Sequence, residues 1–217
     1  MNLEHARFNM VEQQIRPWGV ADPGVRQRLM TVRREDFVPP SMRALAFADI
    51  EIPLPGGQTM LRPSIEGRIL QAIEAFHANT VLEIGAGSGY FAALLAKNAD
   101  HVYTAEIDPE LAQFARDNLM RNGITNVTVE EGDASQGWYS KAPYDLIVVS
   151  GGLPELPEGL LLQLKFGGRL FAFTGSPPVM KACIAFYNDK KILQCRSLFE
   201  TVVPMLRHVT QVPAFNF

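Results

Sequence analysis

The chain has 217 residues, of which 47% are hydrophobic and 20% charged, and these values are typical of one globular domain that buries a core without disulfides or a structural metal. Its 20 lysines and arginines stand against 23 aspartates and glutamates, and the net charge of −3 argues against a basic face that binds nucleic acid or anionic membranes. The two cysteines and four scattered histidines do not form a disulfide scaffold or a metal-binding pattern, so we expect reduced thiols and no bound metal. The sequence has no signal-peptide pattern, and its apolar runs are too short for a bilayer, so we expect a cytoplasmic protein without a membrane partner.

Residues 1–60 differ from the rest of the chain and predict an N-terminal helical cap. Apolar residues at near-helical spacing predict a helix over residues 3–15. Asp22 before a proline has the order of an N-cap and a first helical residue, and it predicts a second helix over residues 23–32. Over residues 38–57, frequent prolines and glycines favour turns and short extended pieces.

From residue 61 onward, predicted helices and strands alternate. The strands are expected at residues 80–84, 101–105, 127–129, 146–149 and 169–173, and the helices at residues 64–76, 91–95, 109–122 and 160–165. Such alternation is typical of right-handed crossovers in a parallel sheet. Residues 191–195 and 198–203 are predicted to pair as antiparallel strands at the sheet edge. We therefore predict a single domain, residues 1–217, whose core (61–217) is Rossmann-like, doubly wound α/β with a mainly parallel, seven-stranded sheet.

A glycine turn after the first core strand carries the first functional signal. Residues 81–90, Val-Leu-Glu-Ile-Gly-Ala-Gly-Ser-Gly-Tyr, predict a strand, a turn and a helix start, where glycines let the backbone approach a ligand and free N–H groups face it. The G-x-G-x-G spacing differs from the G-x-G-x-x-G that binds a dinucleotide. With Glu83 two residues before the first glycine, the loop is typical of S-adenosylmethionine enzymes, although a generic nucleotide loop or a plain turn also fits. Glu83 would lie near the positively charged methionine end, and the candidate cofactor residues are Glu83, Gly85, Ala86, Gly87, Ser88 and Gly89.

The ends of the next two predicted strands offer polar groups to the same ligand. Glu106 follows the glycine loop by about 20 residues, where a carboxylate can accept both ribose hydroxyls, although a surface acid is the alternative. Asp133 can accept from an adenine amino group with help from the Ala134 backbone, although Gly-Asp pairs are also common in turns. Because ligands of open α/β sheets bind at the carboxyl ends of the strands, the three loops together predict an S-adenosylmethionine site.

Segments along nearly the whole chain match one further pattern. They are Arg34–Pro39 (R-x-x-F-V-P), Ala46–Asp49 (A-Y-x-D, with Phe47 here), Ile52–Pro53 (L-P), Gly57–Thr59 (G-Q-T), Ala142–Asp145 (A-P-[FY]-D), Gln163–Leu170 (Q-L-K-x-G-G-R-L) and Val203–Met205 (V-P-L). On these segments the chain resembles the protein-L-isoaspartate O-methyltransferase family. The resemblance implies a class I methyltransferase fold, S-adenosylmethionine as the cofactor, and methylation of isoaspartyl carboxylates in damaged proteins or peptides.

The resemblance also implies roles for residues outside the three loops. It implies cofactor contacts from Gln58, Thr59, Ser64 and Ile107, and substrate contacts from Arg62, Val203 and Pro204. The oligomeric state does not follow from it.

One departure from the family pattern affects the active site. The family reads G-Q-T-I-S-x-P, and Leu61 stands at the position of the serine that is usually assigned to the active site. The Leu61 side chain has no hydrogen-bonding group, so no catalytic residue is assigned. Three hypotheses remain: an isoaspartyl repair enzyme that diverges at this segment, a methyltransferase for another carboxylate or small acceptor, and a cofactor-binding protein without transfer activity.

Overall fold

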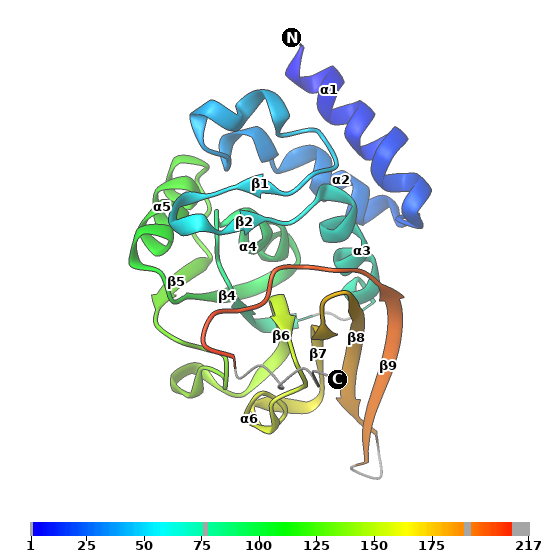
Figure 1. Ribbon diagram of the computed structural model, residues 1–217, viewed down its shortest axis with the longest axis vertical. Coiled ribbons are helices and arrows are strands. Elements are labelled where there is room, and N and C mark those ends of the chain that lie inside the picture. The colour runs from blue at the N-terminus through cyan, green and yellow to red at the C-terminus, as the bar shows by residue number, and fades with distance from the viewer. Residues whose placement is uncertain (1, 76–77, 189–191, 210–217) are drawn as a thin grey trace, which may run out of the picture.

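A seven-stranded sheet forms the centre of the protein, with the strand order β5-β4-β3-β6-β7-β8-β9 (Figure 1). The computed structural model describes residues 2–75, 78–188 and 192–209. The strands are β3 (Ala78–Ile84), β4 (Ala99–Glu106), β5 (Val127–Glu131), β6 (Tyr144–Leu153), β7 (Leu164–Ser176), β8 (Val179–Tyr187) and β9 (Leu193–Glu200). Strands β3 to β7 pair in parallel, whereas β7–β8 and β8–β9 are antiparallel pairs. Because β4 and β6 lie on opposite sides of β3, the strand order changes direction there.

The helices and a small hairpin complete the fold. The helices are α1 (Leu3–Asn9), α2 (Pro23–Thr31), α3 (Pro63–Ile73), α4 (Tyr90–Leu95), α5 (Pro109–Arg121) and α6 (Glu158–Leu161), and the hairpin pairs β1 (Ile52–Pro53) with β2 (Thr59–Met60). Helix α1 continues as a π-helical segment, Met10–Ile15. The predicted N-cap of α2 is confirmed, since the Asp22 side chain accepts the N–H groups of Gly24 and Val25. In Figure 1, α1, α2 and the hairpin lie together at one end of the molecule.

The predicted doubly wound fold with its seven-stranded sheet is confirmed, but two predicted elements are wrong. The helix predicted over residues 160–165 ends at Leu161, and Leu164 already belongs to β7. The antiparallel pair predicted from residues 191–195 and 198–203 is instead one strand, β9, whose partner is β8. In both cases pairing with another strand overrides the local pattern: Leu164 pairs with Tyr144 of β6, and β9 pairs with β8. Residues 76 and 191, at the edges of two predicted elements, lie outside the described part of the chain.

Alternate side chains of the strands enter two apolar clusters, one on each face of the sheet. Val81 belongs to the first cluster and its neighbour Leu82 to the second. Met10, Ile15 and Leu29, all fully buried, belong to the first cluster as well. The N-terminal cap is therefore part of the main core, not an appendage.

A buried ion pair joins the N-terminal segment to helix α3. Arg34 and Glu66 are both buried and pair with each other. Arg34 Nη2 also donates to the Leu61 carbonyl at 2.6 Å, and its guanidinium lies 5.0 Å from the ring centroid of Tyr90. Burial raises the pKa of Glu66 to about 7, although the attraction of Arg34 opposes this shift. Arg34 therefore connects the segment around Leu61, helix α3 and the start of α4.

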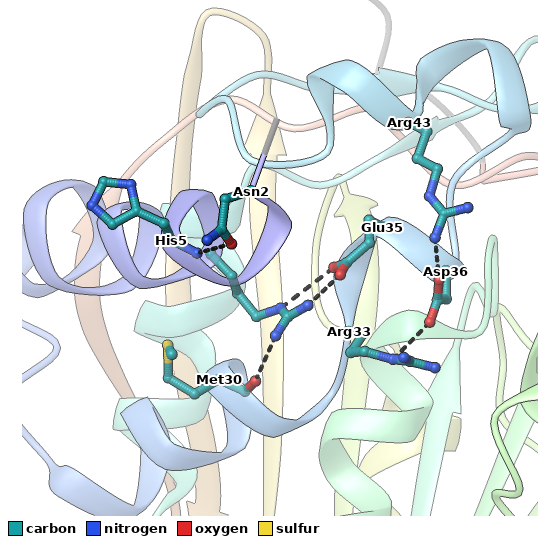
Figure 2. A network of polar contacts seen from close by, with 8 residues as sticks. Asn2, His5, Met30, Arg33, Glu35, Asp36 and Arg43 are labelled. Carbon is teal, nitrogen blue, oxygen red and sulfur yellow. Dashed lines mark hydrogen bonds and ion pairs between the residues drawn. The ribbon is translucent and has the colours of Figure 1, made fainter.

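A second buried pair lies within the cap. Arg7 pairs with the buried Glu35, and the next residue, Asp36, pairs with Arg33 at 2.8 Å and Arg43 at 2.9 Å. Figure 2 shows Glu35 facing helix α1 while Asp36 lies between the two other arginines. These contacts fix α1 against the loop that carries the buried arginine of the first pair.

Replacing Arg34 with methionine should leave the Glu66 carboxylate buried without its partner and lower the free energy of unfolding by about 3–5 kcal/mol at pH 8. The loss should be smaller at pH 6, because Glu66 can then take up a proton. The double variant Arg34→Met/Glu66→Gln should recover part of the loss, since no charge remains buried. Urea unfolding of the three proteins at both pH values measures these differences. An equal loss in the single and double variants would contradict this role of the pair.

Candidate active site

A pocket lies at the carboxyl edge of the sheet, beside the change in strand order at β3. It contains about 710 Å³ of empty space, part of which is open to solvent. The ends of four parallel strands contribute to its wall, with Gly85 after β3, Glu106 in β4, Gly132 after β5 and Ser150 in β6. Leu61 and the segment Pro204–Arg207 line other sides. This is the edge at which open α/β sheets bind ligands.

The glycine loop makes a sharp turn between β3 and α4. Gly85, Gly87 and Gly89 have φ values of 93°, 52° and 79°, which residues with a Cβ rarely adopt. The expectation that the loop offers free N–H groups to a ligand is wrong for all three of these glycines, since Gly89 donates to the Ala86 carbonyl at 2.8 Å. Gly85 donates to the Ala105 carbonyl at 2.9 Å, and Gly87 donates to Glu106 Oε2 at 2.9 Å. The loop therefore holds the Glu106 carboxylate in place.

Glu106 lines the pocket and is almost fully buried. Its Oε2 accepts the Gly87 N–H, and its Oε1 accepts the Asp108 N–H at 3.1 Å. Each oxygen of an ionised carboxylate has two lone-pair positions, so each retains one for a ligand. Two backbone donors thus fix the direction of a carboxylate that still has acceptor capacity.

Asp133 and Ala134 follow β5 and line the pocket beyond Glu106. Asp133 Oδ1 accepts the Ser135 N–H at 2.8 Å, and Oδ2 lies 3.6 Å from His208 Nδ1. Burial opposes ionisation, but the hydrogen bonds from Ser135 and the neighbouring His208 outweigh it and lower the pKa of Asp133. Asp133 is therefore an anion at neutral pH.

Glu83 lies behind the pocket wall, fully buried and outside the lining residues. Its partners are neutral hydroxyls: Thr104 Oγ1 donates to Oε2 at 2.6 Å, and Ser150 Oγ donates to Oε1 at 3.1 Å. Burial raises the pKa of Glu83 to about 8, helped by the charges of Glu106 and Glu66 and opposed by the two hydroxyl bonds. Without a ligand, Glu83 is therefore mostly protonated at neutral pH.

The C-terminal segment packs against the end of β6. The Gly152 N–H donates to the Pro204 carbonyl at 2.8 Å, and the Leu206 N–H donates to the Gly152 carbonyl at 2.9 Å. A Cβ at Gly152 would lie 2.5 Å from Met180 Cε and 2.7 Å from Met205 Sδ, so a larger residue here would require these methionine side chains to move. The segment is thereby fixed along one side of the pocket.

Arg207 fastens this segment to two other parts of the pocket rim. It pairs with Asp108 Oδ2 at 2.9 Å and donates to the Gly56 carbonyl. With its amide oxygen facing the guanidinium, Gln58 accepts from Nε and Nη2 of Arg207 at 3.0 Å. Residues more than 90 positions apart in sequence are thus held together at the rim.

The segment after the hairpin presents only some of its residues to the pocket. Thr59 and Leu61 line it, and Leu61 is buried at 7% exposure. Ser64 is buried in the first turn of α3, where its N–H donates to Asp49 Oδ1 at 3.0 Å. Arg62 is half-buried and precedes α3. Neither Arg62 nor Ser64 is among the lining residues.

Comparison with known proteins decides the family. The family model described as protein-L-isoaspartate(D-aspartate) O-methyltransferase (PCMT) matches residues 6–194. The chain belongs to this family. A Pelobacter propionicus protein named protein-L-isoaspartate O-methyltransferase 2 is 43% identical over 183 residues, which cover 84% of this chain and 81% of that protein. A Rhodopseudomonas palustris protein named protein-L-isoaspartate O-methyltransferase is 45% identical over 77% of each chain.

Solved structures of similar fold carry related names. A protein-L-isoaspartate O-methyltransferase matches with a TM-score of 0.79 and 26% identity over 92% of this chain, which spans 65% of that longer chain. A Plasmodium falciparum protein, described as a putative family member in complex with S-adenosyl-L-homocysteine, matches with a TM-score of 0.80 over 95% of this chain and 99% of its own. At 19% identity, the second likeness supports the fold alone.

The pocket of this family member contains about half of the residues predicted from sequence. Those that line it are Gln58, Thr59, Gly85, Gly87, Glu106, Ile107, Asp133, Ala134 and Pro204. Those that lie outside the lining are Arg62, Ser64, Glu83, Ala86, Ser88, Gly89 and Val203. Of the second set, Ser88 supports the fold: its Oγ accepts the Tyr90 N–H and its carbonyl accepts from Asn118. Cofactor and substrate roles for either set stay predictions.

Sequence reasoning missed several lining residues. They include Leu111, Ser135, Ser150, Gly151, Met205, Leu206 and Arg207. The Ser150-Gly151-Gly152 run after a predicted strand was a usable signal, whereas nothing near Arg207 in the sequence indicates its contacts. In the described ranges, no group of three or more histidine, cysteine, aspartate or glutamate side chains is arranged to hold a metal ion. No helix in that part of the chain is long and apolar enough to cross a membrane.

Replacing Glu83 with glutamine should change how stability depends on pH. The folded ligand-free protein holds a proton on Glu83 up to about pH 8, whereas an unfolded glutamate loses it near pH 4.5, so rising pH favours unfolding across this window. Glu83→Gln removes that contribution, and its advantage over the parent protein should grow by up to ~1.4 kcal/mol per pH unit between pH 5 and 8. Urea unfolding at pH 5, 6.5, 8 and 9 measures the difference. Parallel curves for the two proteins would show that Glu83 is already ionised.

Proposed function

We propose that the protein is an S-adenosylmethionine-dependent O-methyltransferase that methylates isoaspartyl carboxylates of damaged proteins or peptides. The observation that carries this proposal is the pocket at the carboxyl ends of β3, β4 and β5, bordered by the segment with Leu61, in a chain that belongs to this family. The proposal includes a cytoplasmic location, which the two free cysteines support.

The pocket residues fit the cofactor in order along the strand ends. Asp133 and Ala134 would hold the adenine, and the two free acceptor positions of Glu106 would hold the ribose hydroxyls. The methionine part would then lie toward Ser150 and Leu61, the remaining walls of the pocket. The Glu106 carboxylate provides the test of fit, because it lines the pocket and each of its oxygens accepts one backbone N–H, which leaves the number of acceptor positions that two ribose hydroxyls require.

When bound, S-adenosylmethionine supplies a methyl group on a positively charged sulfonium, and the S–CH3 bond breaks as an O–CH3 bond to the acceptor forms. A carboxylate acceptor has a pKa near 4 and is already ionised at neutral pH, so the protein needs no general base. Its contribution is to align the carboxylate with the methyl group and to exclude water. The C-terminal segment Pro204–Arg207, which is held against the pocket, and the apolar Leu61 side chain both favour exclusion of water from the pocket.

A second acceptor class remains a candidate because of Leu61. Its buried side chain lines the pocket where family members have a serine hydroxyl, and it cannot hydrogen-bond to an acceptor. The loss of one charge-assisted hydrogen bond costs about 1–3 kcal/mol, which slows transfer without abolishing it. A different carboxylate that needs no such bond would fit the same pocket.

Replacing Glu106 with alanine should weaken S-adenosylhomocysteine binding by roughly 1–3 kcal/mol, or about 5- to 150-fold, because two charge-assisted ribose bonds are lost. Calorimetry measures the affinity, and the parent protein with S-adenosylmethionine and an isoaspartyl peptide should form S-adenosylhomocysteine. Asp117→Ala, on the surface of α5, serves as a matched loss of a carboxylate away from the pocket. Unchanged affinity in Glu106→Ala would remove Glu106 from the ribose role.

A further inference from the structure

The Thr59 hydroxyl is a polar group that the fold leaves without a partner. Its Oγ1 is buried and makes no hydrogen bond to any described residue. Burying a hydroxyl without a partner is unfavourable by one to a few kcal/mol, so native proteins rarely leave such a hydroxyl without a hydrogen bond. The same side chain lines the pocket. A bound ligand is therefore the natural source of the missing hydrogen bond.

The backbone places Thr59 on the same side of its segment as Leu61. Residues two positions apart in extended chain point to one face, and Thr59 begins the two-residue strand β2, paired with Pro53 of β1. Thr59 and Leu61 both line the pocket, whereas Met60 between them is buried in the apolar core. The Thr59 side chain is therefore next to the side chain of residue 61 in the pocket wall, where family members have a serine.

The other hydroxyls near this part of the pocket are already used or point elsewhere. Ser150 Oγ donates to Glu83. Ser135 lies beside Asp133, at the end of the pocket proposed for adenine. Ser64, two residues beyond the segment, is buried at the start of α3 and does not line the pocket. Among the described lining residues, Thr59 therefore has the hydroxyl for which the fold provides no partner.

We propose that Thr59 is a catalytic residue that donates its hydroxyl to the acceptor carboxylate and takes over the orienting role of a serine at position 61. This inference rests on the proposed function. Donation to one carboxylate oxygen directs the other toward the methyl group. As the O–CH3 bond forms, the electron pair of the S–CH3 bond stays on sulfur, and the carboxylate charge and the sulfonium charge disappear together. No proton has to move.

The first test compares Thr59→Val, which has nearly the same shape without the hydroxyl, with Thr59→Ser, which keeps it. Single-turnover methyl transfer to an isoaspartyl peptide at saturating S-adenosylmethionine isolates the chemical step. Thr59→Val should lower this rate about 10- to 100-fold, and Thr59→Ser should lower it much less. S-adenosylhomocysteine affinity, measured by calorimetry, should change less than threefold in both variants.

The second test introduces Leu61→Ser into the parent protein and into Thr59→Val. If the two positions serve one role, the serine should raise the rate more in the Thr59→Val protein than in the parent, so the two changes are not additive. The double variant also guards against a folding defect, because a rate restored by Leu61→Ser cannot come from a misfolded protein. Thermal unfolding of all four proteins completes the comparison.

Three results would overturn the inference. They are a Thr59→Val rate equal to that of the parent, a Thr59→Val protein whose main loss is in S-adenosylhomocysteine affinity, and equal gains from Leu61→Ser in both backgrounds. The second result would assign the hydroxyl to the cofactor. If the parent protein binds S-adenosylhomocysteine but methylates no isoaspartyl peptide, the proposed function fails instead, and this outcome is recognised before any variant is made.

Discussion

A fully buried guanidinium is tolerated only where fixed acceptors surround it, and Arg34 finds two of them in segments that follow it by about 30 residues. One is the Glu66 carboxylate in α3, and the other is the Leu61 carbonyl in the segment that borders the pocket. The Tyr90 ring, at the start of α4, packs against the same guanidinium. The position of Leu61 relative to the glycine loop therefore depends on one buried charge supplied by the N-terminal cap.

The pocket combines rigid strand ends with two segments fastened over them. Gly87 and Asp108 fix the Glu106 carboxylate from the backbone, so its direction does not depend on a mobile side chain partner. On the other side, Arg207 ties the C-terminal segment to the rim through Asp108 and Gly56. Asp108 thus serves both sides, and a shift of the N-terminus of α5 would move both at once.

The parts of the site that were predictable from sequence are those that follow from local chemistry. The glycines at 85, 87 and 89 have positive φ, and Glu106 follows them at the spacing of one helix and one strand, so both were identified. Arg207 was missed because its partners lie 99 and 151 positions away, and no local pattern reports such contacts. Strand β8 was missed for a different reason: the predicted edge pair was placed within residues 191–203, whereas the observed partners of β9 and β7 lie in β8, between them along the chain.

The consequence of Leu61 was also beyond sequence reasoning. The pattern indicates that a serine is absent, but not that Thr59 lies on the same face with an unpartnered hydroxyl, or that Ser64 is turned into the fold. Which residue compensates for a lost side chain depends on side-chain direction and burial. Both are tertiary properties.

The most direct measurement of the central claim is the rate of S-adenosylhomocysteine formation with an isoaspartyl peptide and with the same peptide carrying ordinary aspartate. Both peptides present a carboxylate of similar pKa, so the comparison tests recognition by the pocket and not acceptor reactivity. The proposed function predicts cofactor-dependent formation with the isoaspartyl peptide and only background with its aspartyl counterpart. Background with both peptides, in a protein that binds S-adenosylhomocysteine, would contradict the claim.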